Sequence, residues 1–162
     1  MPPPTWTYRD DRSLGGWVRG LLTGIVGGLV AVFAVAVWLN PYEADGSPRR
    51  MATHQQLGLP PCSFVQVTKV PCPACGMTTS FALLVRADVR GSLEANWVGT
   101  LLAGFCLLLI PWATLCVVLG RAVFVRSLEK ALIAVLVTLL ALMLLRWVLV
   151  VAVLFYQGTL PP

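Results

Sequence analysis

Charged side chains are scarce in this sequence. Only 12% of its 162 residues are Asp, Glu, Lys or Arg, whereas a soluble domain carries about 25%. Hydrophobic residues make up 57% of the chain, and the mean hydropathy is +0.80. So few polar groups cannot cover the surface of a soluble domain of this length. The scarcity therefore excludes a water-soluble single domain, a disordered chain and a collagen-like chain, and indicates an integral membrane protein.

The excess of positive charge does not indicate nucleic-acid binding. Twelve Lys and Arg residues against seven acidic ones give a net charge of +5. The basic residues form no dense patch with interleaved aromatic side chains, which a nucleic-acid-binding surface would need. They lie instead in short groups at the ends of apolar runs, as the topology signals of membrane proteins do. We therefore expect a lipid bilayer around the chain and no nucleic-acid partner.

Long apolar runs predict an all-α integral membrane protein with three transmembrane helices. A spanning helix needs about 20 predominantly apolar residues. The runs that meet this length lie at about 18–40, 95–119 and 131–155. We predict a polar N-terminal tail over residues 1–17 and a single membrane domain over residues 18–162. Within that domain, residues 42–94 form a cysteine-containing loop with a short helix.

The first apolar run allows a second interpretation. Its basic flank and the stretch Ala34-Val35-Ala36 resemble a secretory signal peptide with a small-x-small cleavage site. The run is longer than the apolar core of a typical signal peptide. This length favours an uncleaved membrane span.

Glycine recurs every four residues at the start of the first run, at Gly16, Gly20, Gly24 and Gly28. On a helix this spacing makes a nearly straight stripe of bare backbone. Small residues let another helix approach closely, and such packing drives helix association in lipid. We predict a helix-packing face, either within the chain or against another membrane protein or a second copy.

The second and third runs each contain an interruption. Pro111 removes a backbone donor from the second run and predicts a kink there. Arg146 places a charge inside the third run, where hydrocarbon makes it costly. Either it snorkels to the headgroups beside Trp147, which is the preferred interpretation, or it lies deeper and needs a carboxylate or carbonyl partner. Cys106 and Cys116 are expected to be small apolar side chains without a chemical role.

Loop charges predict the orientation. With three spans, the N-terminal head and the connection near residue 125 lie on the same side of the membrane. The basic residues of these two segments are Arg9, Arg12, Arg19, Arg121, Arg126 and Lys130. Because basic loops stay in the cytoplasm, this side is predicted to be cytoplasmic and the 42–94 loop to lie outside.

The loop holds three of the five cysteines and the single histidine, His54. Its C-x-x-C pair precedes a run with apolar residues at helical spacing, which predicts a helix too short to span. Such a helix lies in the interface or re-enters the bundle. A proline between the cysteines suits a first helical turn. Because backbone N–H groups and the helix dipole favour a thiolate there, we expect a lowered thiol pKa.

This arrangement permits three chemistries. Cys72 and Cys75 could be the attacking and resolving thiols of a membrane thiol–disulfide oxidoreductase. Zinc prefers four ligands, and the loop offers His54, Cys62, Cys72 and Cys75. The third chemistry is a structural disulfide that staples the loop to the helix start. Because the loop has an odd number of cysteines, one must stay free, pair between chains or bind something.

The segment from residue 62 to about residue 101 resembles a widespread bacterial family of small uncharacterised membrane proteins. Its members carry an upstream Cys, a Cys-Pro-x-Cys-Gly-hydrophobic-Thr motif at a helix start, an Asp after that helix and an Asn-Pro before the next span. The counterparts in this chain are Cys62, Cys72, Pro73, Cys75, Gly76, Met77, Thr78, Asp88 and Asn96. The chain departs at Thr79, where the family usually has Arg, and at Trp97, where it has Pro. The resemblance implies a bacterial inner-membrane protein and implies no activity.

Together these features predict an accessory or assembly component whose CPxC loop is stabilised by a disulfide or a metal. We expect a non-enzymatic role, with zinc as the possible cofactor and the oxidoreductase as the alternative. A transporter or channel lacks support. Apart from Arg19 at the start of the first span, Arg146 and the thiols, the spans contain no ionisable side chain that could relay an ion or proton.

Overall fold

The computed structural model describes residues 13–123 and 128–158. Most of the predicted polar tail, with Arg9 and Arg12, lies outside the described residues, and so does Arg126. Two isolated β-bridges, Ser13 with Arg121 and Tyr42 with Pro48, are the only strand-like pairings in the described part of the chain.

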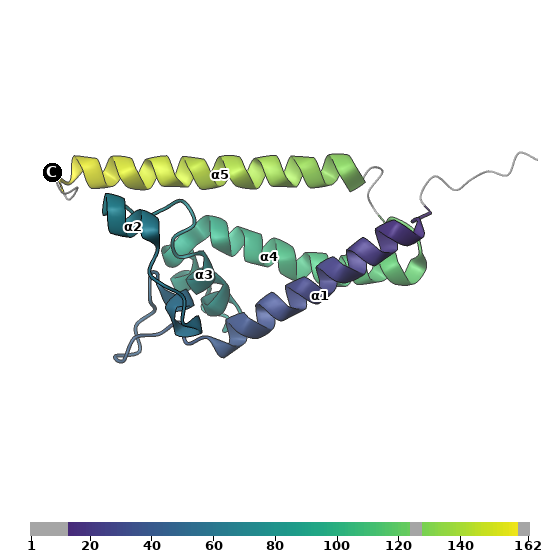
Figure 1. Ribbon diagram of the computed structural model, residues 1–162, viewed down its shortest axis with the longest axis horizontal. Helices are drawn as coiled ribbons and strands as arrows, with labels where there is room; N and C mark the ends of the chain where they lie inside the picture. The colour runs from purple at the N-terminus through teal and green to yellow at the C-terminus, as the bar shows by residue number, and fades with distance from the viewer. Residues whose placement is uncertain (1–12, 124–127, 159–162) are drawn as a thin grey trace, which may run out of the picture.

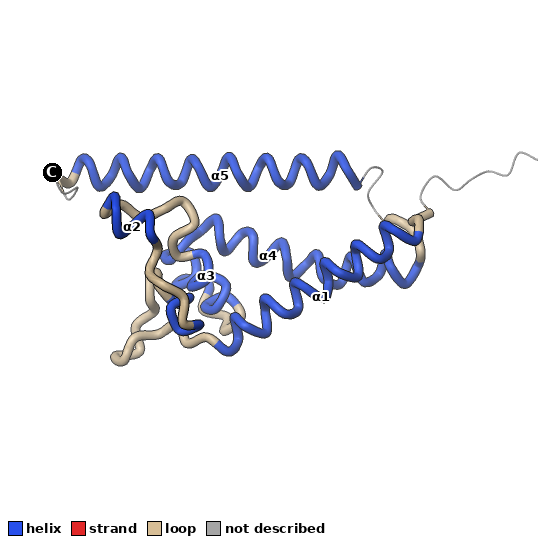
Figure 2. The backbone as a smooth tube through the Cα atoms, in the orientation of Figure 1, coloured by secondary structure: helices blue, strands red, loops and turns tan. Residues whose placement is uncertain are grey.

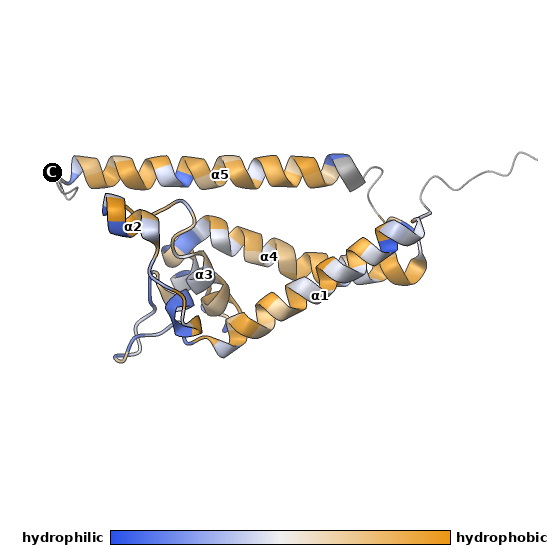
Figure 3. Ribbon diagram, viewed as in Figure 1, coloured by the Kyte–Doolittle hydropathy of each residue, from blue (hydrophilic) through white to orange (hydrophobic). Residues whose placement is uncertain are grey.

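Three long helices dominate the structure: α1 (Gly16–Trp38), α4 (Val89–Leu119) and α5 (Leu128–Tyr156). Each is long and apolar enough to cross a membrane, and hydrophobic residues run along all three (Figure 3). Their apolar surfaces indicate a lipid bilayer as the environment. The prediction of an all-α membrane protein with three spanning helices is confirmed.

Residues 39–88, between α1 and α4, form a compact unit that we call the cap. It contains the 3-10 helix η1 (Thr53–Leu57), α2 (Ser63–Thr68) and α3 (Met77–Leu84). The cap lies at one end of the long helices, and the start of α1 meets the end of α4 at the other end (Figure 1). Loops gather in the cap, while the long helices extend from the cap toward the opposite end (Figure 2). Successive long helices therefore run in opposite directions.

The predicted short helix after the cysteine motif is α3, and it is tucked against the bundle. It packs most extensively against α4. Phe81 of α3 stacks on Phe33 of α1 with ring centroids 5.6 Å apart, and Ala103 and Cys106 of α4 complete this apolar cluster. Cys106 therefore behaves as a buried apolar side chain.

A buried polar contact joins α3 to α4. The fully buried Ser92 hydroxyl donates to the Ser80 carbonyl over 2.8 Å and lies 2.7 Å from the Thr100 hydroxyl. Every buried side-chain N or O atom in the described residues has a hydrogen-bond partner. Because an unpaired buried polar group costs free energy, these bonds fix the position of α3 on α4.

The helical path of α4 breaks at Asn96, whose φ of −162° and ψ of 99° are not helical. The Asn96 side-chain oxygen accepts from the Gly99 N–H over 3.0 Å, as an N-cap residue does. Asp88 caps the start of α4 in the same way, through the Gly91 N–H at 2.9 Å. Pro111 lies inside the helix without non-helical dihedrals, so the predicted interruption occurs at Asn96 instead.

Two adjacent side chains of helix α5 bond to the cap end of the bundle. None of the α5 span is buried. Arg146 donates to the Ala95 carbonyl over 3.1 Å. Trp147 donates to the Pro71 carbonyl over 2.9 Å and meets the Phe64 ring edge-on. Of the two alternatives for Arg146, the structure supports the carbonyl partner over the preferred headgroup contact.

The glycine stripe has no partner within the described chain. A Cβ added at Gly16, Gly20, Gly24 or Gly28 would meet nothing within 4 Å. A shallow groove of about 620 Å³ follows the first three of these glycines. The alternative of packing within the chain is therefore not supported, and packing between copies or against another protein stays a prediction.

We predict that Ser92→Ala destabilises the bundle by about 1–3 kcal/mol, because it removes the side-chain donor to the Ser80 carbonyl and the bond between the Ser92 and Thr100 hydroxyls in a buried site. Thr114→Ala is the matched control. Its hydroxyl bonds only to the Ile110 carbonyl of its own helix and is exposed. Thermal unfolding in detergent would measure both, and equal unfolding temperatures would contradict the structural role of Ser92.

Candidate functional site

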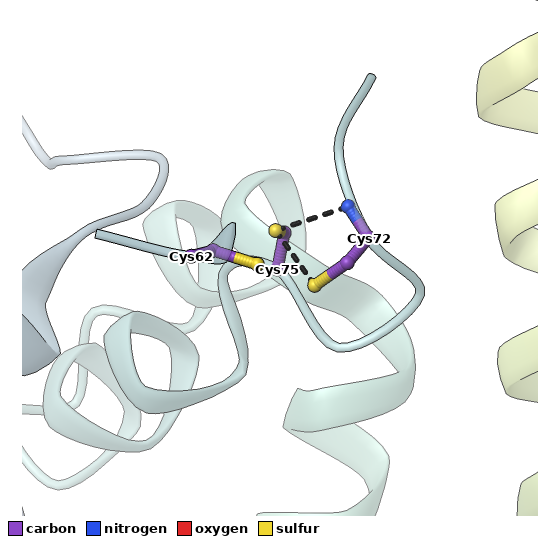
Figure 4. Close-up of side chains that lie close together, drawn as sticks. All are labelled: Cys62, Cys72 and Cys75. Carbon is purple, nitrogen blue, oxygen red and sulfur yellow. Dashed lines mark hydrogen bonds between the residues drawn. The ribbon is translucent and has the colours of Figure 1, made fainter. Parts of the chain in front are cut away.

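Three thiols from two segments of the cap converge. Cys62 is the residue before α2, and Cys72 and Cys75 lie in the turn before α3. Their Sγ atoms all lie within 4.8 Å of one another, and each side chain is partly buried. Figure 4 shows the three side chains directed toward a common point. The three cysteines are close enough to hold a metal ion.

The turn itself brings Cys72 and Cys75 into contact. The Cys75 N–H donates to the Cys72 carbonyl over 3.0 Å, and the Cys72 N–H donates to the Cys75 Sγ over 3.1 Å. The two Sγ atoms are 2.8 Å apart and hydrogen-bonded, whereas a disulfide bond is about 2.05 Å long. All five cysteines are free thiols, so the predicted disulfide is not confirmed.

Gly76 and Asn96 hold the turn against the start of α4. Gly76 has a φ of +85°, which favours glycine. A Cβ there would lie 2.6 Å from the Ala95 carbonyl oxygen and 2.8 Å from that of Arg50. The Asn96 amide donates to the Cys75 carbonyl over 3.1 Å. The break in α4 and the cysteine motif are therefore parts of one arrangement.

The remaining motif residues have separate positions. Pro73 lies in the turn and not in the first turn of a helix, because α3 begins only at Met77. This corrects the sequence-based expectation. Thr78 is partly buried and lines the pocket beside the thiols. Asp88 caps α4 and lies 3.5 Å from the Tyr42 hydroxyl, which donates to it.

The thiol pKa values differ from the sequence-based expectation. Burial, followed by the hydrogen bond with Cys72, raises the pKa of Cys75 to about 12. The expected lowering is therefore wrong for Cys75, because its loss of solvent outweighs the effect of a helix start. The pKa of Cys62 is lowered, chiefly by the backbone N–H of Val65 in α2. The helix start that favours a thiolate belongs to α2.

His54 does not belong to the thiol cluster. It lines the same pocket of about 550 Å³ as the three cysteines, but the group of ligand atoms within 4.8 Å contains only the thiols. The four predicted zinc ligands are thus brought to one pocket, and three of them to one point. The pocket leaves a side of the cluster open to a further ligand.

Sequence reasoning did not connect Arg146 and Trp147 with the thiols. Trp147 binds the carbonyl of Pro71, the residue before Cys72. Arg146 binds the Ala95 carbonyl, which also touches Gly76, and its charge interacts with Cys75 and Cys72. A lone charge inside an apolar run was the available signal. Sequence spacing alone could not show that α5 passes the cap at this residue.

Thr79, the residue after Thr78 of the motif, makes a neutral and buried contact. The Thr79 hydroxyl lies 2.8 Å from the Thr53 hydroxyl of η1, and both side chains are buried. A cation nevertheless lies near the thiols, because α5 supplies Arg146. The charge thus comes from a helix outside the motif.

The model of a family described as "Protein of unknown function (DUF2752)" matches residues 62–110. The matched range begins at Cys62 and contains the cysteine turn, α3 and much of α4. This agrees with the resemblance to an uncharacterised family. Searches of curated proteins and of solved structures found no match. The comparisons therefore assign no activity.

We predict that Gly76→Ala is more damaging than Gly58→Ala. Both glycines have positive φ, +85° and +75°, a conformation that costs a residue with a Cβ about 1–2 kcal/mol. Only Gly76 would also bring its Cβ against backbone carbonyls, whereas nothing lies within 4 Å at Gly58. Gly76→Ala should therefore lower the unfolding temperature further and expose Cys75 to alkylation. Equal effects of the two substitutions would contradict the close contact at Gly76.

Proposed function

We propose that Cys62, Cys72 and Cys75 bind a metal ion that holds the cap together, and that the chain is an accessory or assembly component of a membrane. The observation that carries this proposal is the approach of three Sγ atoms to within 4.8 Å. Thiolates bound to one Zn²⁺ at about 2.3 Å would lie about 3.8 Å apart. Small side-chain rotations would increase the distance between the Cys72 and Cys75 Sγ atoms from 2.8 Å to this value.

Zinc is the metal that fits this donor set, since thiolates are soft ligands that bind it well. To hold the ion, Cys62, Cys72 and Cys75 would have to be deprotonated, and their three protons would pass to solvent. The charge of the ion overcomes the raised pKa of Cys75, because a coordinating thiol is deprotonated by the metal. His54, which lines the adjoining pocket, or a water molecule is available for the fourth position.

A metal link between Cys62 and the cysteine turn would stabilise a weakly packed part of the cap. Helix α2 contains no buried residue, so apolar packing contributes little to its position. A metal bound to Cys62, Cys72 and Cys75 would tie α2 to the turn before α3. Small units with little core are often stabilised in this way, and metal binding then adds directly to folding free energy.

We further propose that the protein lies in a bacterial inner membrane with its N-terminus in the cytoplasm and its cap outside. Arg19 lies near the start of α1 and Arg121 just after the end of α4. These two helix ends meet at the end of the bundle opposite the cap (Figure 1), and their basic residues favour a cytoplasmic location for that end. The exposed glycine stripe and the unburied α5 leave helix faces for another membrane protein or a second copy.

Purified protein is predicted to contain zinc in stoichiometric amount by elemental analysis. Replacement of Cys62, Cys72 or Cys75 by Ser should remove the metal and lower the unfolding temperature, and a chelator should do the same to the wild type. Cys106→Ala is the matched control, because that thiol is buried between α3 and α4, away from the cluster. A wild-type protein that is folded and contains no metal would contradict the proposal.

A membrane thiol–disulfide oxidoreductase is the second candidate, favoured by the 2.8 Å contact between the Cys72 and Cys75 Sγ atoms. The Cys72 thiolate would attack a substrate disulfide and form a mixed disulfide. The Cys75 thiolate would then attack the Cys72 Sγ and release the substrate thiolate. The substrate disulfide is thereby reduced by two electrons, and Cys72 and Cys75 are oxidised to a disulfide. The pKa of about 12 keeps Cys75 protonated at neutral pH, as a resolving thiol can be before that step.

Thiol trapping in intact cells tests this second function. An oxidoreductase predicts that Cys72 and Cys75 change between reduced and oxidised forms after a reductant or oxidant is added, and that Cys75→Ser accumulates a mixed disulfide through Cys72. A pair that keeps one state throughout the challenge would exclude the enzyme.

A further inference from the structure

Arg146 lies well inside the apolar helix α5, where a charge needs a partner. An ionisable side chain within a membrane span is costly unless it faces a polar group, and it is therefore a candidate for a functional contact. Its side chain is partly buried and reaches from α5 to the start of α4. The charge is thus directed toward the cap end of the bundle.

No carboxylate neutralises this arginine in the described part of the chain. The ion pairs between Arg49 and Glu43 and between Arg90 and Glu94 do not include it. The hydrogen bond of Arg146 goes to the neutral carbonyl of Ala95. That bond satisfies a donor of the guanidinium and leaves its positive charge uncompensated.

The groups that could carry the opposite charge are the thiols. The Ala95 carbonyl that holds Arg146 lies against Gly76, and the next residue, Asn96, binds the carbonyl of Cys75. The arginine is therefore connected to the cysteine turn through two neighbouring residues of α4, Ala95 and Asn96. Ionised thiols at Cys75 and Cys72 would favour its charge.

A simple count of charge shows what the metal centre would lack. Three thiolates carry three negative charges and Zn²⁺ carries two positive ones, so the centre has a net charge of minus one. A net charge in a partly buried site beside apolar helices is unfavourable unless it is paired. We propose that Arg146 is the counter-charge of the metal–thiolate centre, a positioning residue through which α5 completes the site. The inference rests on the proposed metal-binding function.

This pairing makes α5 part of the site. Because α5 has no buried residue in its span, the bonds of Arg146 and Trp147 contribute to its attachment. A bound metal strengthens the attraction between α5 and the cap, and by linkage the docked α5 strengthens metal binding. Partners of a metal site beyond its direct ligands typically change affinity by about 10- to 100-fold when mutated.

Competition with a chelator, on purified full-length protein in detergent, measures the zinc affinity. Arg146→Gln keeps a hydrogen-bond donor for the Ala95 carbonyl and removes the charge, so it should bind zinc about 10- to 100-fold more weakly. Arg146→Lys keeps the charge and should restore most of the affinity. Arg86→Gln is the matched control, because Arg86 donates to the Ala36 and Val37 carbonyls at the end of α1. It should bind as the wild type does.

Binding of Co²⁺ in place of Zn²⁺ shows whether Arg146→Gln has lost only the charge of Arg146 or has also disturbed the three thiolate ligands. At saturating Co²⁺ the thiolate-to-metal absorption bands of Arg146→Gln should match those of the wild type, and apo Arg146→Gln should show the wild-type circular dichroism. Wild-type affinity in Arg146→Gln, or equal weakness in Arg146→Lys, would overturn the inference and leave the metal site intact. A wild-type protein that binds no zinc would instead overturn the proposed function itself.

Discussion

The Asn96 side chain connects the membrane bundle with the cysteine motif, and most of the cap depends on it. In an unbroken helix the Gly99 N–H would bond to the Ala95 carbonyl, but here it donates to the Asn96 side-chain oxygen. The Ala95 carbonyl then becomes available to Arg146, and Gly76 fits against it. The other end of the Asn96 amide binds the Cys75 carbonyl. One break in α4 thus positions the cysteine turn, the glycine after it and the arginine of α5.

The features that follow from local pattern could be predicted, and those that depend on long-range contacts could not. The three spanning helices follow from apolar runs, and α3 follows from helical spacing after the motif. The pKa of Cys75 depends on burial and on Cys72. For this reason the pKa is raised, whereas the position before a helix predicted that it would be lowered. Pro111 was the expected interruption, but an apolar helix tolerates proline, whereas the Asn96 side chain offers the backbone a competing partner. The approach of Arg146 to the thiols requires the path of α5, which no local pattern contains.

Packing is distributed unevenly over the bundle. Helix α3 contributes a buried apolar cluster with α1 and α4 and a satisfied polar contact through Ser92. Helix α5 has neither, and in a bilayer the lipid removes the hydrophobic drive for helices to associate. Contacts that lipid cannot replace then help to fix its position, among them the bonds of Arg146 and Trp147 to backbone carbonyls of the cap end. The chemistry of the cap and the placement of the third span are therefore coupled.

The same arginine bears on the choice between the candidate functions. A Cys72–Cys75 disulfide carries no charge, so oxidation would leave Arg146 beside apolar helices with only the Ala95 carbonyl as a partner. A metal–thiolate centre, in contrast, supplies the anion that the guanidinium lacks. If the pair were a redox couple, a nearby cation would favour the reduced thiolate form and make the disulfide strongly oxidising, as stabilised reduced forms do. Arg146 thus weighs against a static disulfide and toward a state in which the thiols are ionised.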